Sequence, residues 1–362
     1  MFKKVIALAV TGLASGALFA QANVTVYGLL DAGYNEVHTD GARTERSIDS
    51  SQTAGSRLGF KGSEDLGGGL KALFVLEYAL ANDINSTIGS ASKWSATATR
   101  QAYVGLGSDY GTLTLGRLQT AAFNWACTYS PLTGGIFGTD LRLGARTYSD
   151  CGNAGRADNA VGYVSPNLAG LTIAGNHILR TEGESANVAD DYANQLGITY
   201  LNGGLQVGLI YNQVSRNKVP GSTTRTTDSD IREYGIGATY DFKVVKLFAS
   251  YANNKVEGFQ AESKYQVGAT VPVFENGLIL GSFAANSMIG DETDSKIWSV
   301  AYNHSLSKRS VLYAGYGLLT NEAKAQRGMG PPANPSIGQP AYPLPPLGGN
   351  SSIFGLGIRH SF

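Results

Sequence analysis

The chain has 362 residues, with 28 lysines and arginines, 28 acidic residues, 47 glycines and 19 tyrosines, and only 15% of its residues are charged. Helical periodicity is almost absent, and no apolar run beyond the amino terminus reaches the roughly twenty residues that a membrane-spanning helix needs. These features exclude a helix-rich enzyme. The charges balance and there is no basic run, so the sequence shows no positively charged region that would bind nucleic acid. The composition therefore indicates an all-β protein.

The first residues, MFKKVIALAVTGLASGALFA, contain Lys3 and Lys4, a short apolar stretch and then small residues. This order is typical of a secretory signal peptide rather than a membrane span. We expect residues 1–20 to be the signal peptide, with cleavage after Ala20 or Ala22, and residues 21–362 to form a single domain. An exported chain reaches an oxidising compartment, where a cysteine pair can form a disulfide.

Short segments that alternate apolar and polar residues follow to the end of the sequence. We expect about sixteen strands, each near the length of about ten residues at which a tilted strand crosses a bilayer. The segments are 23–34, 56–64, 70–80, 100–108, 111–117, 158–166, 171–180, 195–202, 205–214, 233–242, 245–253, 264–274, 278–288, 296–305, 311–320 and 352–362.

The connections between these segments alternate in length. Short links such as DLGGG, NGG and ENG alternate with long polar ones such as TEGESANVADDYAN. Outer-membrane barrels show this asymmetry, with short turns on the periplasmic side and long loops outside. A soluble sandwich has no reason to sort its loops by length.

The two faces of the segments differ in character. In 23–34, Val24 and Val26 share one face, while Tyr27 and Asp31 share the other. The polar faces are too rich in Gly, Ser, Thr and charge to pack in a dry core, so we expect them to line water. The apolar faces must then meet lipid, where open sheet edges and unpaired backbone are intolerable. The pattern predicts a closed, transmembrane, antiparallel β-barrel, and it places Asp31 and Lys61 in the lumen.

The segment SSIFGLGIRHSF ends on Phe362, with Phe354, Leu356 and Ile358 on the same face. Closure of a barrel pairs the last strand with the first and removes both edges. We therefore expect Phe362 to lie in the wall as one of the aromatic residues at the membrane interface.

The stretches VTVYGLLDAGY, SRLGFKGSEDLGGGLKALFVLEYAL, RQAYVGLG, GTLTLGR and GIRHSF closely resemble the general-diffusion porins of β-proteobacteria. The resemblance extends over essentially the whole mature chain. It implies a sixteen-stranded homotrimer in the outer membrane of a Gram-negative bacterium, which passes small hydrophilic solutes without a cofactor. It also implies a third long loop folded into the barrel, contact with outer-membrane lipid and lipopolysaccharide, and recognition of Phe362 by the barrel-insertion machinery.

In the anion-preferring members of that family, wall arginines face the third loop. Matched position by position, these arginines fall on Arg57, Arg100 and Arg156. Side-chain alternation places Arg57 and Arg156 on the inner face. Arg100 instead shares its parity with outward residues such as Ala102 and Val104, so it needs a bulge or an irregular strand start. The alternative for each is a solvated arginine at a strand end.

Residues 119–156 form a long connection without strand pattern, which we call loop 3. Such a connection is usually functional or disordered, and its aromatic residues Phe123, Trp125 and Phe137 could anchor it against the inner wall. We expect Asp140 to be the acid that faces the arginines and forms the pore constriction with them. A rim-exposed Asp140 is the alternative.

Cys127 and Cys151 are the two cysteines of the chain, and both lie in loop 3. A metal site would need more ligands than two distant cysteines, and no histidine is near. Two free thiols remain the alternative. We expect a disulfide, which would remove about 3 kcal/mol of denatured-state entropy.

These features predict a water-filled channel that selects by size and then by charge. Because the arginines outnumber the nearby acids, we expect a modest anion preference. The alternatives are a channel selective for a particular sugar or anion, and a plugged structural barrel. No histidine has catalytic spacing, and neither G-x-S-x-G nor H-E-x-x-H occurs, so no enzyme is predicted. The proline-rich stretch 321–352 is expected to be a surface loop that partly covers the pore mouth.

Overall fold

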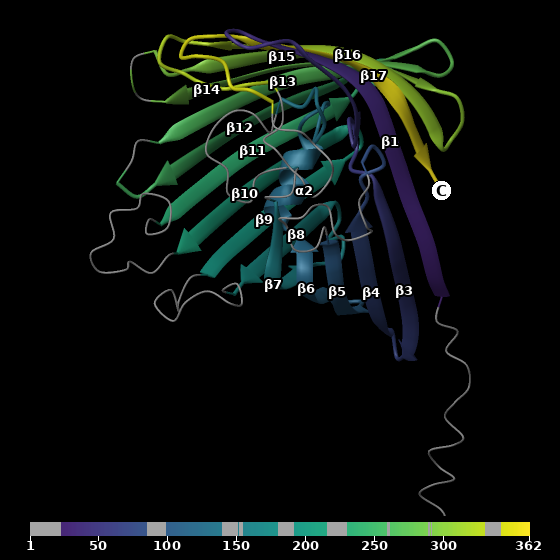
Figure 1. Ribbon diagram of the computed structural model, residues 1–362. Coiled ribbons are helices and arrows are strands. Elements are labelled where there is room, and N and C mark those ends of the chain that lie inside the picture. The colour runs from purple at the N-terminus through teal and green to yellow at the C-terminus, as the bar shows by residue number, and fades with distance from the viewer. Residues whose placement is uncertain are drawn as a thin grey trace, which may run out of the picture.

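The computed structural model describes residues 23–84, 99–139, 151, 155–179, 192–215, 230–258, 261–288, 290, 292–329 and 342–362. Within them, seventeen strand segments form one antiparallel sheet that closes on itself (Figure 1). The elements are β1 (Asn23–Thr39), β2 (Glu45–Ser50), β3 (Arg57–Gly67), β4 (Leu70–Ala79), β5 (Thr99–Ser108), β6 (Gly111–Gln119), α2 (Ala121–Thr128), β7 (Arg156–Val164), β8 (Leu171–Ile178), β9 (Tyr192–Asn202), β10 (Leu205–Ser215), β11 (Ile231–Asp241), β12 (Lys246–Val256), β13 (Glu262–Val273), β14 (Gly277–Met288), β15 (Ser295–Ser305), β16 (Ser310–Asn321) and β17 (Ser351–Ser361).

The barrel closes between its first and last strands, which lie side by side in Figure 1. β1 pairs with β17 from Leu29 opposite Ser361 to Thr39 opposite Ser351. Along its other edge β1 pairs with both β2 and β3, so these two segments occupy one position in the wall. The wall therefore has sixteen positions, and the prediction of a closed barrel of about sixteen strands is confirmed.

The strand segment that the sequence pattern missed is β2. Its residues, ERSIDS, show no apolar alternation, and it forms by pairing with residues 32–37 of β1. Residues 51–56 then interrupt the wall before β3. Asp31 holds this break, because its carboxylate accepts hydrogen bonds from the backbone N–H groups of Thr53 and Ala54, each at 2.8 Å.

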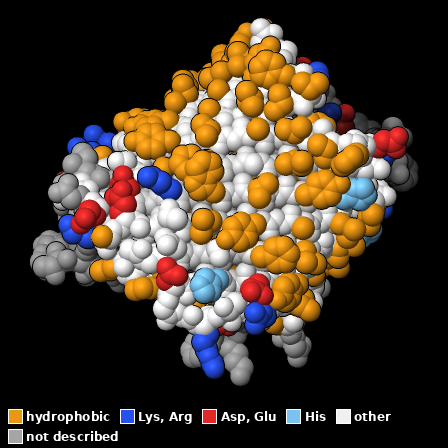
Figure 2. Space-filling model, turned by 90° about the horizontal axis from the view of Figure 1, so that it is seen from above, with side chains coloured by type: hydrophobic (Ala, Val, Ile, Leu, Met, Phe, Trp, Pro, Cys, Tyr) orange, Lys and Arg blue, Asp and Glu red, His pale blue; other side chains and the backbone are white. Residues whose placement is uncertain are grey.

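Large hydrophobic side chains cover the outer face, as predicted. Val24 and Val26 are each 56% exposed, and exposed apolar residues recur on the same face of the other strands. Figure 2 shows one side of the outside, where hydrophobic and uncharged side chains fill the middle and most charged ones lie toward the margins. This surface suits the hydrocarbon of a bilayer between two polar interfaces.

The connections differ at the two ends of the wall. The turns at 68–69, 109–110 and 203–204 each have two residues, whereas loop 3 separates Gln119 from Arg156. Among the described residues no helix is both long and apolar enough to cross a membrane.

The inner face is not polar throughout. On β1, β15, β16 and β17 it carries a buried apolar cluster, which we call the apolar arc; loop residues cover it. The arc comprises Val37, Ile297, Ala301, Tyr313, Leu319 and Ile353, with Leu280 and Ala284 of β14 beside it, and the covering residues are Leu132, Ile136 and Phe137 of loop 3 and Met329. The expectation that the inner face lines water is therefore wrong for this part of the wall.

Met329 belongs to the connection 322–350, which we call loop 8. Beyond the expected cover of the pore mouth, its described ends contact the inside of the wall. The Met329 side chain is fully buried, and the Tyr342 hydroxyl donates to Asn35 Oδ1 at 2.9 Å and to Asp49 Oδ2 at 2.7 Å. Loop 8 is thus attached to the inside of the wall at both of its described ends.

Candidate pore constriction

Loop 3 enters the barrel directly after β6 and forms the helix α2 (Figure 1). Thr120 caps the helix, since its hydroxyl accepts a hydrogen bond from the Phe123 N–H at 3.1 Å and donates one to the Gly155 carbonyl at 2.9 Å. The wall satisfies another amide of the first turn, because Ala121 N–H donates to Asn176 Oδ1 at 2.7 Å. First-turn amides have no partner within a helix, so these contacts fix where α2 begins.

Aromatic side chains hold loop 3 against glycines of the wall. Trp125 Nε1 donates to the Gly208 carbonyl at 3.1 Å. A Cβ atom on Gly208 or Gly237 would overlap the ring of Tyr129, so these two glycines make room for it. Burial raises the pKa of Tyr129 to about 12.

Polar side chains of β13 and β14 hold the next part of loop 3 by hydrogen bonds. Gln266 Nε2 donates to Thr139 Oγ1 at 2.8 Å and to Ser282 Oγ at 3.1 Å. The Ser130 hydroxyl is a third polar neighbour of this amide nitrogen, which has two hydrogens to share among the three. Gln266 therefore joins two points of loop 3 to one point of the wall.

The loop then reaches the seam of the barrel, where β1 pairs with β17. Ile136 N–H donates to the Gln52 carbonyl at 2.7 Å, and the Phe137 ring lies against Gly315 and Gly355. The described part of loop 3 thus follows the wall from β8 to β17 and on to the 51–56 break. The inner face of β3 to β7 stays outside this path.

The inner face of β3 to β7 carries the predicted arginines, and a carboxylate lies among them. Arg100 Nε donates to Glu77 Oε1 at 2.7 Å, and Arg57 Nε lies 3.6 Å from Glu77 Oε2. The Tyr27 hydroxyl donates to Glu77 Oε2 at 3.1 Å. Arg57 also donates to the Gly55 carbonyl at 3.3 Å, so the break in the wall helps to position this cluster.

Arg100 reaches the inner face through the irregularity that its sequence position requires. The β4–β5 register shifts between Glu77 and Tyr78, so that Glu77 pairs with Gln101 but Tyr78 pairs with Thr99. The extra residue, Arg100, turns toward Glu77. A bulge re-aims a side chain in this way.

Arg156 lies at the start of β7 and is only 8% exposed. Its guanidinium carbon lies 4.7 Å from the centre of the Phe123 ring. Arg100 and Glu77 are among the charged groups that act on it, so it shares the electrostatic environment of the other two predicted arginines. We call Arg57, Glu77, Arg100 and Arg156 the arginine arc.

The other predicted site residues have different positions. Lys61 is exposed in the lumen, with Nζ 5.4 Å from the centre of the Tyr27 ring. Asp31 points inward but is fully buried, because the 51–56 break covers it, so it does not line water. Asp140 lies outside the described residues. Arg359, which the sequence reasoning did not select, faces inward on β17 and acts on Arg57.

Phe362 extends the seam beyond β17. Its backbone N–H and carbonyl each bond to Gly28 at 3.1 Å, and its ring lies where a Cβ atom on Gly28 would be. The ring is half-exposed on the outer face, the place expected for an interfacial aromatic residue.

The predicted disulfide is present. It joins Cys127, in the last turn of α2, to Cys151, with 4.9 Å between the Cα atoms.

Glu77 is the member of the arginine arc that the sequence reasoning missed. It lies in a strand that is otherwise apolar near its end, LFVLEYA, and its alternation matches the inner face. The available signal was a carboxylate in a wall strand close to Arg57. Arg57 pairs with Ala79, which lies two residues from Glu77. The cluster has three guanidinium groups and one carboxylate, so its formal charge is positive. Such a charge beside a narrow water path attracts anions.

Comparison with known proteins agrees with this architecture. Residues 7–324 match the family described as Gram-negative porin. The chain belongs to the Gram-negative porin family. It is 30% identical to outer membrane porin protein 32 of Delftia acidovorans over the whole of both chains. It is also 30% identical to an outer membrane porin of Bordetella pertussis, covering 88% of this chain and 94% of that one.

Solved structures give the same result. An anion-selective porin from Comamonas acidovorans superposes with a TM-score of 0.74 at 26% identity, covering 94% of this chain and all of the other. This porin is therefore a passive channel of the Gram-negative outer membrane. Its family and fold point to a channel rather than an enzyme.

Proposed function

We propose that this porin is a general-diffusion channel with a modest anion preference, narrowed between the arginine arc and loop 3. The observation that carries the proposal is that Arg57 and Arg100 pair with Glu77 on the inner wall, while Arg156 lies over Phe123 within the influence of the same charges. The described part of loop 3 follows the wall from β8 to β17, so solutes would pass beside the guanidinium groups. The similar porin from Comamonas acidovorans is described as anion-selective, which supports the proposed sign. Asp140 stays our candidate for the opposing acid.

The test is a planar-bilayer recording with a potassium chloride gradient. We expect a reversal potential of the sign that a faster chloride flux produces. A potential of the opposite sign would overturn the proposed charge role. Liposome swelling with neutral sugars of increasing size would measure the size limit independently of charge.

The rival function is a channel selective for one sugar or anion. Such a channel needs exposed aromatic or polar groups to bind its solute. In the described part of loop 3, Trp125, Tyr129 and Phe137 are instead buried against the wall, which favours general diffusion. A conductance that saturates with one solute, and is blocked by it, would favour the rival.

We further propose that the protein is a homotrimer that contacts outer-membrane lipid and lipopolysaccharide. The resemblance to porins supports trimerisation, and the half-exposed Phe362 suits recognition by the insertion machinery. Native mass spectrometry in detergent would give the subunit number, and a monomer would contradict the proposal. Replacing Phe362 by Ala should slow membrane insertion in cells without altering channels that have already formed.

A further inference from the structure

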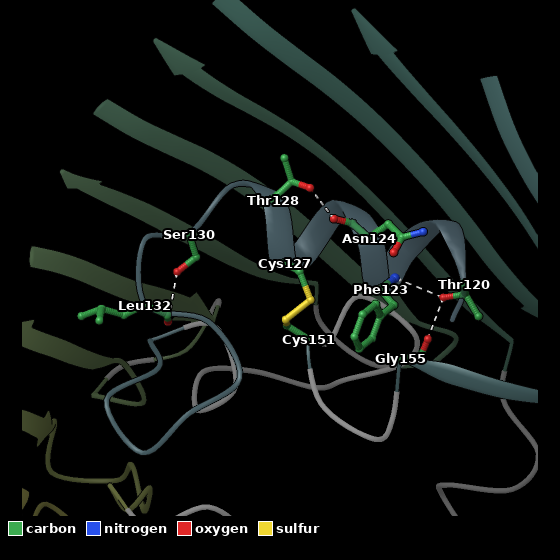
Figure 3. Close-up of a disulfide and its surroundings, with 9 residues drawn as sticks. All are labelled: Thr120, Phe123, Asn124, Cys127, Thr128, Ser130, Leu132, Cys151 and Gly155. Atoms are coloured by element: carbon green, nitrogen blue, oxygen red, sulfur yellow. Dashed lines mark hydrogen bonds between the residues drawn. A yellow bond between two sulfur atoms is a disulfide. The ribbon is translucent and has the colours of Figure 1, made fainter. Parts of the chain in front are cut away.

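The helix α2 presents a distinct face to the returning leg of loop 3 (Figure 3). Thr120, Phe123 and Cys127 recur at the spacing that puts helical residues on one side. Each contacts the return leg. The Thr120 hydroxyl binds the Gly155 carbonyl at 2.9 Å, the Phe123 ring lies 4.7 Å from the Arg156 guanidinium, and Cys127 is bonded to Cys151.

The opposite side of α2 faces the wall. Ala121 N–H and Trp125 Nε1 donate to Asn176 and Gly208. The helix is therefore held between the wall and the return leg. With 8 residues, it is shorter than the about 12–15 residues that a helix needs to be even marginally stable alone. Its position depends on these attachments.

Arg156 depends on α2 in turn. The guanidinium is buried and lies over the Phe123 ring, an arrangement that attracts a planar cation to an aromatic face. The ring can stay beneath Arg156 only while α2 keeps its distance from the return leg. Thr120 fixes that distance at the start of the helix, and the disulfide fixes it at the end.

We propose that the Cys127–Cys151 disulfide is a positioning element for the pore, which keeps Phe123 beneath Arg156 and so holds that charge at the constriction. The proposal rests on the channel function proposed above for Arg156. The disulfide closes a loop whose two ends lie inside the barrel, 24 residues apart, while strand pairing closes the wall without it. Its effect should therefore appear in ion selectivity more than in barrel stability.

The test compares the double variant Cys127→Ser/Cys151→Ser with Phe123→Leu and with the combination of both. We expect the double variant to lower the anion-over-cation permeability ratio roughly twofold, as when one of three pore charges moves away, and to increase current noise. Phe123→Leu keeps the disulfide and should produce the same loss. The combination should add nothing further, because both changes act through one contact. Thr128→Ala, on the exposed side of α2, is the matched control and should leave the ratio unchanged.

A double variant with the wild-type ratio and noise, in a barrel with wild-type circular dichroism and melting temperature, would overturn the proposal. Additive effects would also overturn it, since they would mean that the disulfide acts elsewhere. Should the double variant not fold, Phe123→Leu decides alone, because a wild-type ratio in it removes the contact on which the proposal depends. Arg156→Gln separates the two proposals. If Arg156→Gln leaves the permeability ratio unchanged, the pore role of Arg156 fails. If Arg156→Gln changes the ratio but the double cysteine variant does not, the positioning role of the disulfide fails.

Discussion

The arginine arc and the apolar arc are two parts of one inner wall with opposite chemistry, since one carries charged side chains and the other apolar ones. On β3 to β5, Arg57 and Arg100 pair with Glu77 on the inner face, and the described part of loop 3 beyond α2 follows other strands. On β15 to β17 and β1, side chains such as Val37 and Leu319 are buried beneath loops 3 and 8. The alternation of a strand decides only which residues point inward. What each inward residue meets is decided by the loops.

The difference has a consequence for the shape of the water path. Loops can fold stably into a barrel only if they bury apolar surface or satisfy polar groups there. The apolar arc provides the first, through Phe137 and Met329, and Gln266 provides the second. Under the proposed function the path lies toward the arginines, which would increase their influence on passing ions.

The largest expected effect is on the arginine arc. Glu77→Gln leaves Arg57 and Arg100 without their buried partner, and we expect a loss of about 3–5 kcal/mol in the free energy of unfolding. Urea-induced unfolding, followed by tryptophan fluorescence, would measure it. The anion preference should rise at the same time.

The control for that variant is Glu36→Gln, whose partner Arg46 lies 2.8 Å away on the exposed outer surface. It should leave the unfolding midpoint unchanged, because exposed ion pairs contribute little. Equal effects of the two substitutions would mean that the charged cluster is not a buried, coupled unit.

A smaller effect is expected on the apolar arc. Met329→Ala removes about 2–5 kcal/mol of packing from the attachment of loop 8. We expect this end of the loop to detach and the single-channel conductance to rise, with little change in barrel stability. Leu344→Ala is the matched control, since Leu344 lies in the same loop but is 60% exposed. Unaltered conductance in Met329→Ala would show that loop 8 does not narrow the path.

The smallest effect concerns the room made for loop 3. Gly237→Ala places a methyl group where the Tyr129 ring lies, and overpacking of this kind costs about 1–3 kcal/mol. We expect the loop to be pushed into the bore and the conductance to fall. Gly281→Ala, where a Cβ atom meets nothing within 4 Å, should behave as wild type. A fall in both variants would point to a general effect of wall glycines.

Much of this molecule was predictable from its sequence because strand alternation is a local property. The sixteen segments, the outward face of Val24 and Val26, and the irregular start required at Arg100 all follow from side-chain parity. The disulfide followed from cysteine number and compartment. β2 was missed because its pairing with β1, rather than its own pattern, makes it a strand.

Other features depend on contacts between distant parts of the chain. Parity places Asp31 inward but does not show that the 51–56 break covers it. In the same way, nothing local to Val37 or Ile353 reveals that they are buried in one cluster with Met329 of loop 8. The role of Glu77 required the register of the β3–β4 hairpin and the bulge at Arg100 together.

The central claim is that ions pass beside the arginine arc. The most direct test is the reversal potential in a potassium chloride gradient, measured for the wild-type porin and for the variant Arg57→Gln/Arg100→Gln/Arg156→Gln. We predict that the wild type prefers chloride and that the variant loses this preference or reverses it. A variant that folds and keeps the wild-type potential would contradict the account.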